Sequence, residues 1–145
     1  MKNIFLLMLI LCAANANALG TPNQTATRAS LIQLISTPEK FDGKLVRLIG
    51  AVQFEFEGNE LCFHKEDLEN SISENCLWLS LEKNMLETTN QSLSEFNGNY
   101  VIIEGVFKKN NKGHRNLFSG SIESINRLHP WQIDKEKRSR LKGSQ

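Results

Sequence analysis

The sequence predicts a mainly β protein whose five strands form one small, strongly curved sheet that closes into a barrel. The first observation is a pair of strings, Gly43–Gly50 and Gly98–Gly105, each a run of apolar and β-branched residues with glycines seven positions apart. Glycine at such places lets a strand bend or approach its neighbour closely, as the corners of a barrel require. The second is a regular alternation of apolar and polar residues, typical of strands with one buried face. The third is length, since about 125 residues after an export signal suffice for one core.

The first 18 residues have the three parts of a secretory signal peptide. Lys2 supplies the positive charge, Ile4–Cys12 the apolar stretch, and Ala14–Ala16 or Ala16–Ala18 a cleavage site of small residues. A transmembrane helix needs about 20 apolar residues, and no segment of the chain offers that many. We therefore expect an exported protein, periplasmic or secreted, without a membrane span.

The rest of the chain divides into a mobile polar leader at 19–29, one domain at 30–133 and a basic tail at 134–145. The tail holds five basic and two acidic residues and almost no apolar residue, which is typical of a disordered end. Loss of Lys2 with the signal peptide leaves equal numbers of basic and acidic residues in the mature chain. Because strong binding to nucleic acid draws on a net positive charge, nucleic acid is not the partner we expect.

The domain begins with a short helix. Ser30 and Gln33 fit a capping box ahead of the apolar pairs that follow, and Thr37-Pro38 ends the helix because proline disfavours helical geometry in the residue before it. Phe41–Gly43 then turns the chain into the first strand.

The first strand is expected over 44–57, with a bend at Gly50 that lets it belong to both halves of the barrel. Its even positions are predicted to face the core: Val46, Leu48, Val52, Phe54 and Phe56. Gly58-Asn59 is predicted to form a two-residue hairpin turn into the second strand.

The second and third strands, 60–64 and 76–82, place their two cysteines on the outward face. The apolar residues of the other face are expected to point inward: Leu61 and Phe63 in the second strand, and Leu77, Leu79 and Leu81 in the third. Export leaves Cys62 and Cys76 as the only cysteines, in a compartment that favours oxidation. If the strands are antiparallel neighbours, a structural disulfide would close the polar excursion at 65–75.

The remaining elements complete the barrel. A helix is expected over 83–97, a fourth strand over 99–108 that is covered on both sides, and a turn at 110–113. A fifth strand is expected from Leu117-Phe118 to about Leu128. Trp131, after Pro130, is predicted to close one end of the barrel.

Five strands, a long bent first strand and a helix between strands three and four resemble the oligonucleotide/oligosaccharide-binding (OB) fold, a Greek-key barrel. The resemblance covers residues 40–128. At a finer level the chain resembles a family of small bacterial proteins, many of them exported, that carries no known activity. The strings behind this resemblance are Ser30–Ile35, Phe41–Gly50, Phe54–Asn59, His64–Asp67, Asn111–His114 and Leu117–Gly120.

The OB resemblance implies a ligand surface on the outward face of strands one to three and on the loop between strands four and five. An exposed tryptophan beside an arginine can stack on a sugar, a base or a partner's side chain. The candidate contact residues are Arg47, His64, Trp78, Lys112, His114 and Arg115. As alternatives, Trp78 packs as a satellite of the core, and the basic loop at 108–115 is a soluble hairpin tip.

We expect a non-catalytic binding module whose partner is an envelope protein or a glycan, with no cofactor. An inhibitor or immunity protein against an exported toxin is one form of this function. Three other functions compete with it. A metal-assisted hydrolase could use the imidazoles and carboxylates of His64, His114, Glu66 and Asp67 as zinc ligands. The spacing of these residues matches no ligand motif. Binding of single-stranded nucleic acid is favoured by the fold alone. A redox role for the cysteines is disfavoured because they lie 14 residues apart on strands.

Overall fold

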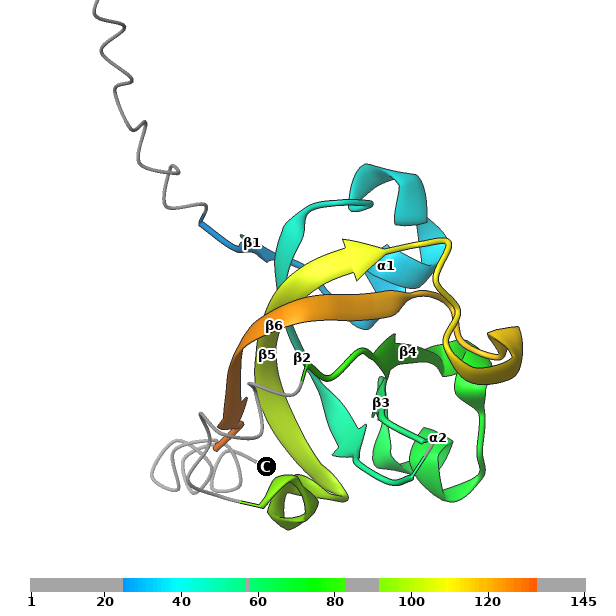
Figure 1. Ribbon diagram of the computed structural model, residues 1–145, viewed down its shortest axis with the longest axis vertical. Helices are drawn as coiled ribbons and strands as arrows, with labels where there is room; N and C mark the ends of the chain where they lie inside the picture. Colours follow the sequence, from blue (N-terminus) through cyan, green and yellow to red (C-terminus); the bar gives the residue numbers. More distant parts are fainter. Residues whose placement is uncertain (1–24, 57, 83–91, 133–145) are drawn as a thin grey trace, which may run out of the picture.

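The computed structural model describes residues 25–56, 58–82 and 92–132 of the 145-residue chain (Figure 1). The predicted signal peptide and the basic tail lie outside the described residues. The strands are β1 Thr27–Arg28, β2 Leu45–Gln53, β3 Glu60–Cys62, β4 Cys76–Leu79, β5 Asn99–Lys108 and β6 Ser121–Pro130. The helices are α1 Leu31–Ser36 and α2 Lys65–Glu69, with short 3-10 turns η1 Pro38–Lys40, η2 Ser73–Asn75, η3 Leu93–Phe96 and η4 His114–Asn116.

Five of these strands form a closed barrel. The sheet order is β1-β2-β3-β4-β6-β5, and β5 pairs back with β2 to close it. Within the barrel, β4 and β6 are parallel and the other pairs are antiparallel. The long curved strands β5 and β6 lie side by side (Figure 1), and β5 also pairs antiparallel with β2. A closed five-stranded barrel with this order confirms the predicted OB-like fold class.

The strand β2 serves both halves of the barrel, as predicted. It pairs with β5 along Leu45–Val52 and with β3 along Ala51–Gln53. Gly50 lies within the β5 pairing, directly before the residues that pair with β3, and a Cβ atom there would stand 2.7 Å from the carbonyl oxygen of Cys62 and 2.9 Å from Cγ of Leu61. Glycine is therefore needed at this position because β3 approaches the backbone of β2 closely.

The core forms from alternate strand residues, which confirms the predicted inward faces at most positions. The predicted positions that are buried are Val46, Leu48, Val52, Phe54, Leu61, Leu77 and Leu79, joined by Val101, Ile103, Phe107 and Ile122. Phe63 and Leu81 are partly buried against this core. The prediction for Phe56 is wrong, because its side chain is 96% exposed. The strand ends at Gln53, so the alternation no longer governs the side chains that follow.

The elements at the barrel ends follow from local sequence. The capping box of α1 forms as predicted, since the Ser30 hydroxyl accepts the Gln33 backbone N–H and the Gln33 side chain accepts the Ser30 backbone N–H. Leu31 and Leu34 of this helix are fully buried. The predicted helix at 83–97 lies largely outside the described residues. Within its described part, Leu93–Phe96 form the 3-10 turn η3, which buries Leu93 and Phe96 in the core.

Several predicted boundaries differ from the structure. The β2–β3 connection runs from 54 to 59 and contains a turn closed by the Gly58 N–H and the Glu55 carbonyl, so the two-residue turn is wrong. The predicted mobile leader ends earlier than expected, because Thr27–Arg28 pair in parallel with Val46 and Arg47. The fifth barrel strand starts at Ser121 and continues to Pro130.

The predicted disulfide is present and holds a second, smaller cluster outside the barrel core. Cys62 and Cys76 are opposite each other in the β3–β4 register, and their sulfur atoms are bonded. Both cysteines and Phe118 are buried together, with Leu68 and Trp78 packed against them. The bridge thus closes the excursion that contains α2 and η2, as expected from the shared face of the two cysteines.

Candidate binding surface

The candidate tryptophan of the predicted surface, Trp78, is half-buried. Its indole lies 5.4 Å from the ring of Phe118, centroid to centroid. A Cβ atom on Gly113 would stand 2.5 Å from Cγ of Trp78, so the backbone of the β5–β6 loop lies directly on the indole. The outward face that the strand alternation predicted for Trp78 is therefore covered by the protein's own loop.

The loop over Trp78 presents three of the other candidate residues. Lys112 and Arg115 are exposed, and His114 is half-buried at the start of η4. Arg115 has a φ of +55°, and Gly113 before it has a φ of +62°. The structure thus places Lys112, His114 and Arg115 in the β5–β6 loop, whose Gly113 lies against Trp78.

His64 lies elsewhere, at the N-cap of α2. Its ring is exposed and stands 4.1 Å from the ring of Phe63. The His64 backbone N–H donates to Oδ2 of Asp67 at 2.8 Å, and Asn75 donates to Oδ1 of the same carboxylate at 2.8 Å. Asp67 is buried and its two oxygens hold the excursion in shape. This carboxylate is therefore occupied by structural hydrogen bonds.

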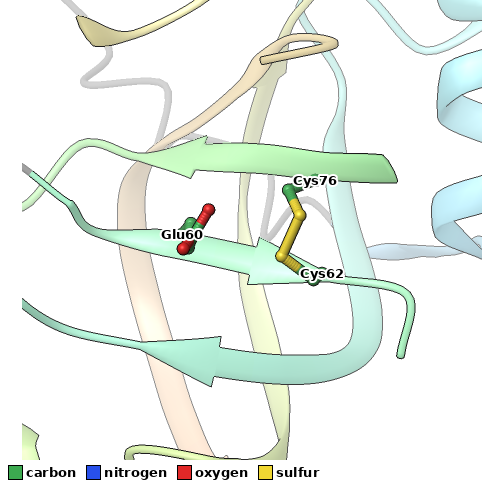
Figure 2. A group of neighbouring side chains, drawn as sticks. All are labelled: Glu60, Cys62 and Cys76. Carbon is green, nitrogen blue, oxygen red and sulfur yellow. A yellow bond between two sulfur atoms is a disulfide. The ribbon is translucent and has the colours of Figure 1, made fainter. Parts of the chain in front are cut away.

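The predicted metal ligands do not gather. Among the residues that the structure describes, one group of three His, Cys, Asp or Glu side chains has its ligand atoms within 4.8 Å of one another. That group is Glu60, Cys62 and Cys76 (Figure 2), and its two sulfur atoms are joined in the disulfide. His64, Glu66, Asp67 and His114 form no such group, so the geometry gives no support to a metal-assisted hydrolase.

Glu60 is half-buried on β3, next to the disulfide. Burial, followed by repulsion from Glu55, raises the pKa of its carboxyl above the ordinary value. Glu60 is opposite Gln53 on β2 and Trp78 on β4 in the strand register. The two sulfur atoms beside it are bonded to each other.

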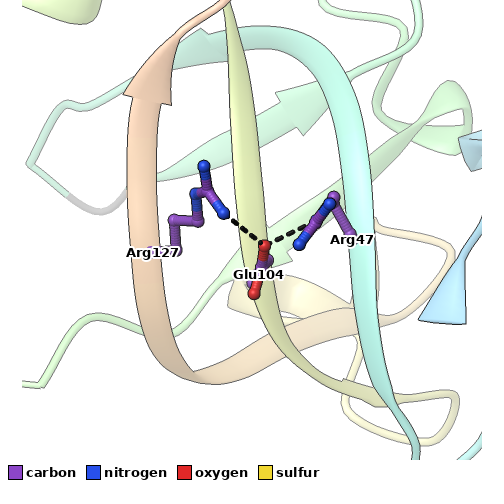
Figure 3. Close-up of polar contacts among 3 residues, drawn as sticks. All are labelled: Arg47, Glu104 and Arg127. Atoms are coloured by element: carbon purple, nitrogen blue, oxygen red, sulfur yellow. Dashed lines mark hydrogen bonds and ion pairs between the residues drawn. The ribbon is translucent and has the colours of Figure 1, made fainter. Parts of the chain in front are cut away.

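Arg47 lies apart from Trp78, on the half of β2 that pairs with β1 and β5. Its Nε donates to Oε1 of Glu104 at 2.6 Å, and Nη1 of Arg127 donates to the same oxygen at 3.1 Å. Figure 3 shows the carboxylate of Glu104 between the two guanidiniums, one from β2 and one from β6. The predicted neighbourhood of Arg47 and Trp78 is therefore replaced by a cluster on the other strands.

This cluster belongs to a row that crosses four strands. Arg28 is opposite Arg47, Arg47 is opposite Glu104, and Glu104 is opposite Arg127. Side chains of directly opposed residues share one face of a sheet, so the four point to the same outer side of the barrel. Three arginines share this side with one glutamate, and two of them contact its carboxylate, which leaves a local surplus of two positive charges.

Apolar side chains continue this surface beyond the charged row. Ile49 is opposite Ile102, and both are at least partly exposed. Trp131 follows, 40% exposed, with its backbone N–H donating to the Tyr100 carbonyl at 2.7 Å. Trp131 lines a groove together with Arg47, Ile49 and Ile102, so it adjoins this surface, and its closure of a barrel end stays a prediction. We call this surface the outer face, defined as Arg28, Arg47, Ile49, Ile102, Glu104, Arg127 and Trp131.

Two shallow grooves meet at Trp131. The first, of about 340 Å³, is lined on the outer face by Arg28, Arg47, Ile49, Ile102 and Trp131, together with Ala29 and Ser30. The second, of about 420 Å³, is lined by Lys65, Glu95, Phe96, Asn99, Tyr100, Pro130, Trp131 and Gln132. Trp131 lines both grooves, so its indole is available to a ligand that extends from one groove into the other.

Sequence reasoning missed most of this surface. The predicted fourth strand was expected to be covered on both sides, but only one side of β5 is fully buried, and Ile102 and Tyr100 on the other side are partly exposed. The available signal was the apolar residue at an outward position in each of two strands, Ile49 and Ile102. An outward apolar pair is typical of a covered face or of a contact surface.

In the described part of the chain, no helix has the length and apolar character that crossing a membrane requires. Comparisons of the chain with protein-family models, with curated proteins and with solved structures found no match.

Proposed function

We propose that this protein is an exported, non-catalytic binding module of the bacterial envelope that contacts a glycan or protein partner through the outer face. The signal-peptide pattern in residues 1–18 supports the exported location. The observation that carries the proposal is the surplus of arginines beside an exposed tryptophan on one side of the barrel. Tryptophan and arginine contribute most of the binding energy in many interfaces.

The outer face is a better contact surface than the predicted one. Trp78 is half-buried, with the β5–β6 loop lying on its indole and the Phe118 ring 5.4 Å away. Trp131 and Ile49 are 40% and 37% exposed. Burial of apolar area yields about 25 cal/mol for each Å² removed from water, so a partner gains most where rings and aliphatic chains are still accessible.

Orientation of the charged groups is already fixed in the free protein. Glu104 is 12% exposed and accepts hydrogen bonds from two guanidiniums that are 39% and 43% exposed. Arginines held in place lose less side-chain entropy when a partner binds, which raises affinity. The outer face therefore combines apolar area with preorganised cations, which is the composition of a binding surface.

The proposal is tested by recovering partners from a bacterial envelope extract. The bait proteins are the wild type, the double variant Arg127→Ala, Trp131→Ala, and the control Lys40→Ala, which removes an exposed cation on η1. We expect one defined glycan or protein fraction to be retained by the wild type and the control and lost with the double variant. Equal retention by all three proteins would overturn the assignment of this face.

A further inference from the structure

We propose that the ligand of the outer face is an acidic polysaccharide, with one sugar ring stacked on Trp131 and a neighbouring carboxylate bound by the arginine row. This inference rests on the proposed function and names the ligand class for the same surface. Its first support is the position of Trp131 between two grooves. A compact ligand would need one groove, whereas a linear polymer crosses the ring and occupies both.

The arginine side of the surface fits a carboxylate. Arg47 uses Nε and Arg127 uses Nη1 to hold Glu104. A guanidinium carries five N–H donors, so both arginines keep donors for a second acid group. Arg28 stands next in the same row, beside the groove that leads to Trp131. Charge-assisted bonds from such planar donors are stronger than neutral ones and favour carboxylate over hydroxyl groups.

The groove on the other side of Trp131 has a different chemistry. It is lined by Asn99, Gln132 and Glu95, and by Lys65, whose ammonium lies 5.7 Å from the centre of the Tyr100 ring. Amides both donate and accept hydrogen bonds, as the many hydroxyls of a sugar require. The faces of a sugar ring carry C–H groups that pack on an indole, while its edge stays polar. One groove therefore suits an acid group and the other suits neutral hydroxyls.

The charge of the chain favours an external anion over coverage by the protein itself. The sequence after Gln132 holds five basic and two acidic residues at 134–145. Like charge opposes docking of this tail on the arginine row, and the same charge adds to the attraction for a polyanion. An external anionic molecule is therefore a better ligand for the outer face than the basic C-terminal tail.

Nucleic acid and acidic peptides fit the surface less well. Single-stranded nucleic acid is held by successive bases on several aromatic platforms. Among the described residues of these two grooves, Trp131 is the aromatic side chain that both share, and the Tyr100 ring already faces Lys65. An acidic peptide would pair with the arginine row. It would offer no run of hydroxyls to the groove that contains Asn99 and Gln132, on the other side of Trp131.

The experiment measures binding of defined probes by titration calorimetry with the mature protein. The acidic probes are oligogalacturonate, a hyaluronan hexasaccharide and a disaccharide-peptide from peptidoglycan. Neutral dextran oligosaccharides, polyglutamate and a thymidine oligonucleotide are the comparison ligands. The variants are Trp131→Ala, Arg127→Gln and Arg127→Lys, with Lys40→Gln as the control, and circular dichroism checks that each is folded.

We expect at least one acidic oligosaccharide to bind more tightly than every comparison ligand. Loss of a charge-assisted bond or of an aromatic anchor weakens binding by about tenfold or more, so Trp131→Ala and Arg127→Gln should each do so. Arg127→Lys should lose less, because it keeps the charge and loses the planar donor fork. Lys40→Gln should bind as the wild type does.

Three results would overturn the inference: no binding of any acidic oligosaccharide, tighter binding of polyglutamate or the oligonucleotide, or unchanged binding on Trp131→Ala. The first result can coexist with partner recovery that depends on Arg127 and Trp131, in which case the outer face remains the binding surface and only the ligand class is wrong. Recovery of the same partner fraction by the double variant Arg127→Ala, Trp131→Ala would rule out the outer face as the binding surface.

Discussion

Nε of Arg47 donates to Oε1 of Glu104 at 2.6 Å across the β2–β5 pair, the pair that closes the barrel. Glu104 is 12% exposed and Arg47 is 39% exposed, so the carboxylate is the less hydrated partner. Because Arg127 also donates to this oxygen, Glu104 is the centre of the cluster and each arginine is at its edge.

Glu104→Gln should therefore destabilise the protein more than Arg127→Gln. The first change leaves neighbouring guanidiniums without a compensating charge and should cost about 1–2 kcal/mol of the free energy of unfolding. The second removes an exposed cation while Arg47 still pairs with the carboxylate, and should cost less than about 1 kcal/mol. Urea unfolding measures both. Equal losses would contradict the central position of Glu104.

Replacing both cysteines with alanine should destabilise the fold substantially. The bridge joins residues 14 apart in the sequence and closes the excursion that carries α2 and η2. A closed loop of this length restricts the unfolded chain by about 3 kcal/mol. We expect a loss of that size in urea unfolding of Cys62→Ala, Cys76→Ala, and a similar loss for wild type under reducing conditions. A loss below about 1 kcal/mol would show that the bridge adds little to the other contacts of this segment.

Gly113→Ala should be more damaging than Gly98→Ala, although both glycines have positive φ values of +62° and +67°. A Cβ at Gly98 would meet nothing within 4 Å, whereas one at Gly113 would lie 2.5 Å from Cγ of Trp78. Gly113 also has a ψ of −154°, a combination essentially restricted to glycine. Steric cost alone predicts about 1–2 kcal/mol at Gly98 and at least about 2 kcal/mol at Gly113.

The fluorescence of Trp78 separates the two glycine variants. Displacement of the loop from the indole should shift the emission of Gly113→Ala, measured in a Trp131→Phe background, and leave that of Gly98→Ala unchanged. Identical spectra and identical stability losses would show that the loop does not rest on Trp78.

Glu60→Gln should stabilise the protein at neutral pH. Burial, with repulsion from Glu55, raises the pKa of Glu60 in the folded protein, so the folded state binds this proton more tightly than the unfolded chain. The contribution of Glu60 to stability is therefore complete below its ordinary pKa and is lost as the pH rises through the folded-state value.

We expect a higher midpoint of thermal unfolding for Glu60→Gln than for wild type at pH 7, and no difference at pH 3. Glu39→Gln, an exposed position on η1, controls for the general loss of one negative charge. A lower midpoint for Glu60→Gln at pH 7 would mean that the charged carboxylate is stabilised in the folded state.

Alternation along single strands predicted much of the fold, because it depends only on neighbouring residues. It placed Leu77 and Leu79 inside and Cys62 and Cys76 on one shared face, and it failed at Phe56, beyond the end of the strand. The capping box at Ser30 was equally predictable, since its two partners lie three residues apart.

The binding surface was less predictable, because it depends on which strands become neighbours. Arg28, Arg47 and Arg127 share a row only through the pairings of β1, β2, β5 and β6, which bring together residues far apart in the sequence. Trp78 has the outward direction that its strand predicts, but the β5–β6 loop covers it through a contact that no local pattern encodes.

The most direct test of the central claim is hydroxyl-radical footprinting of the protein alone and bound to the envelope fraction that it retains. The two tryptophans distinguish the two surfaces, since Trp131 lies on the outer face and Trp78 beneath the β5–β6 loop. The outer-face assignment predicts that binding protects Trp131 and Ile49 from oxidation and leaves Trp78 and His114 unchanged. Protection of Trp78 and His114, with Trp131 oxidised as in the free protein, would contradict it.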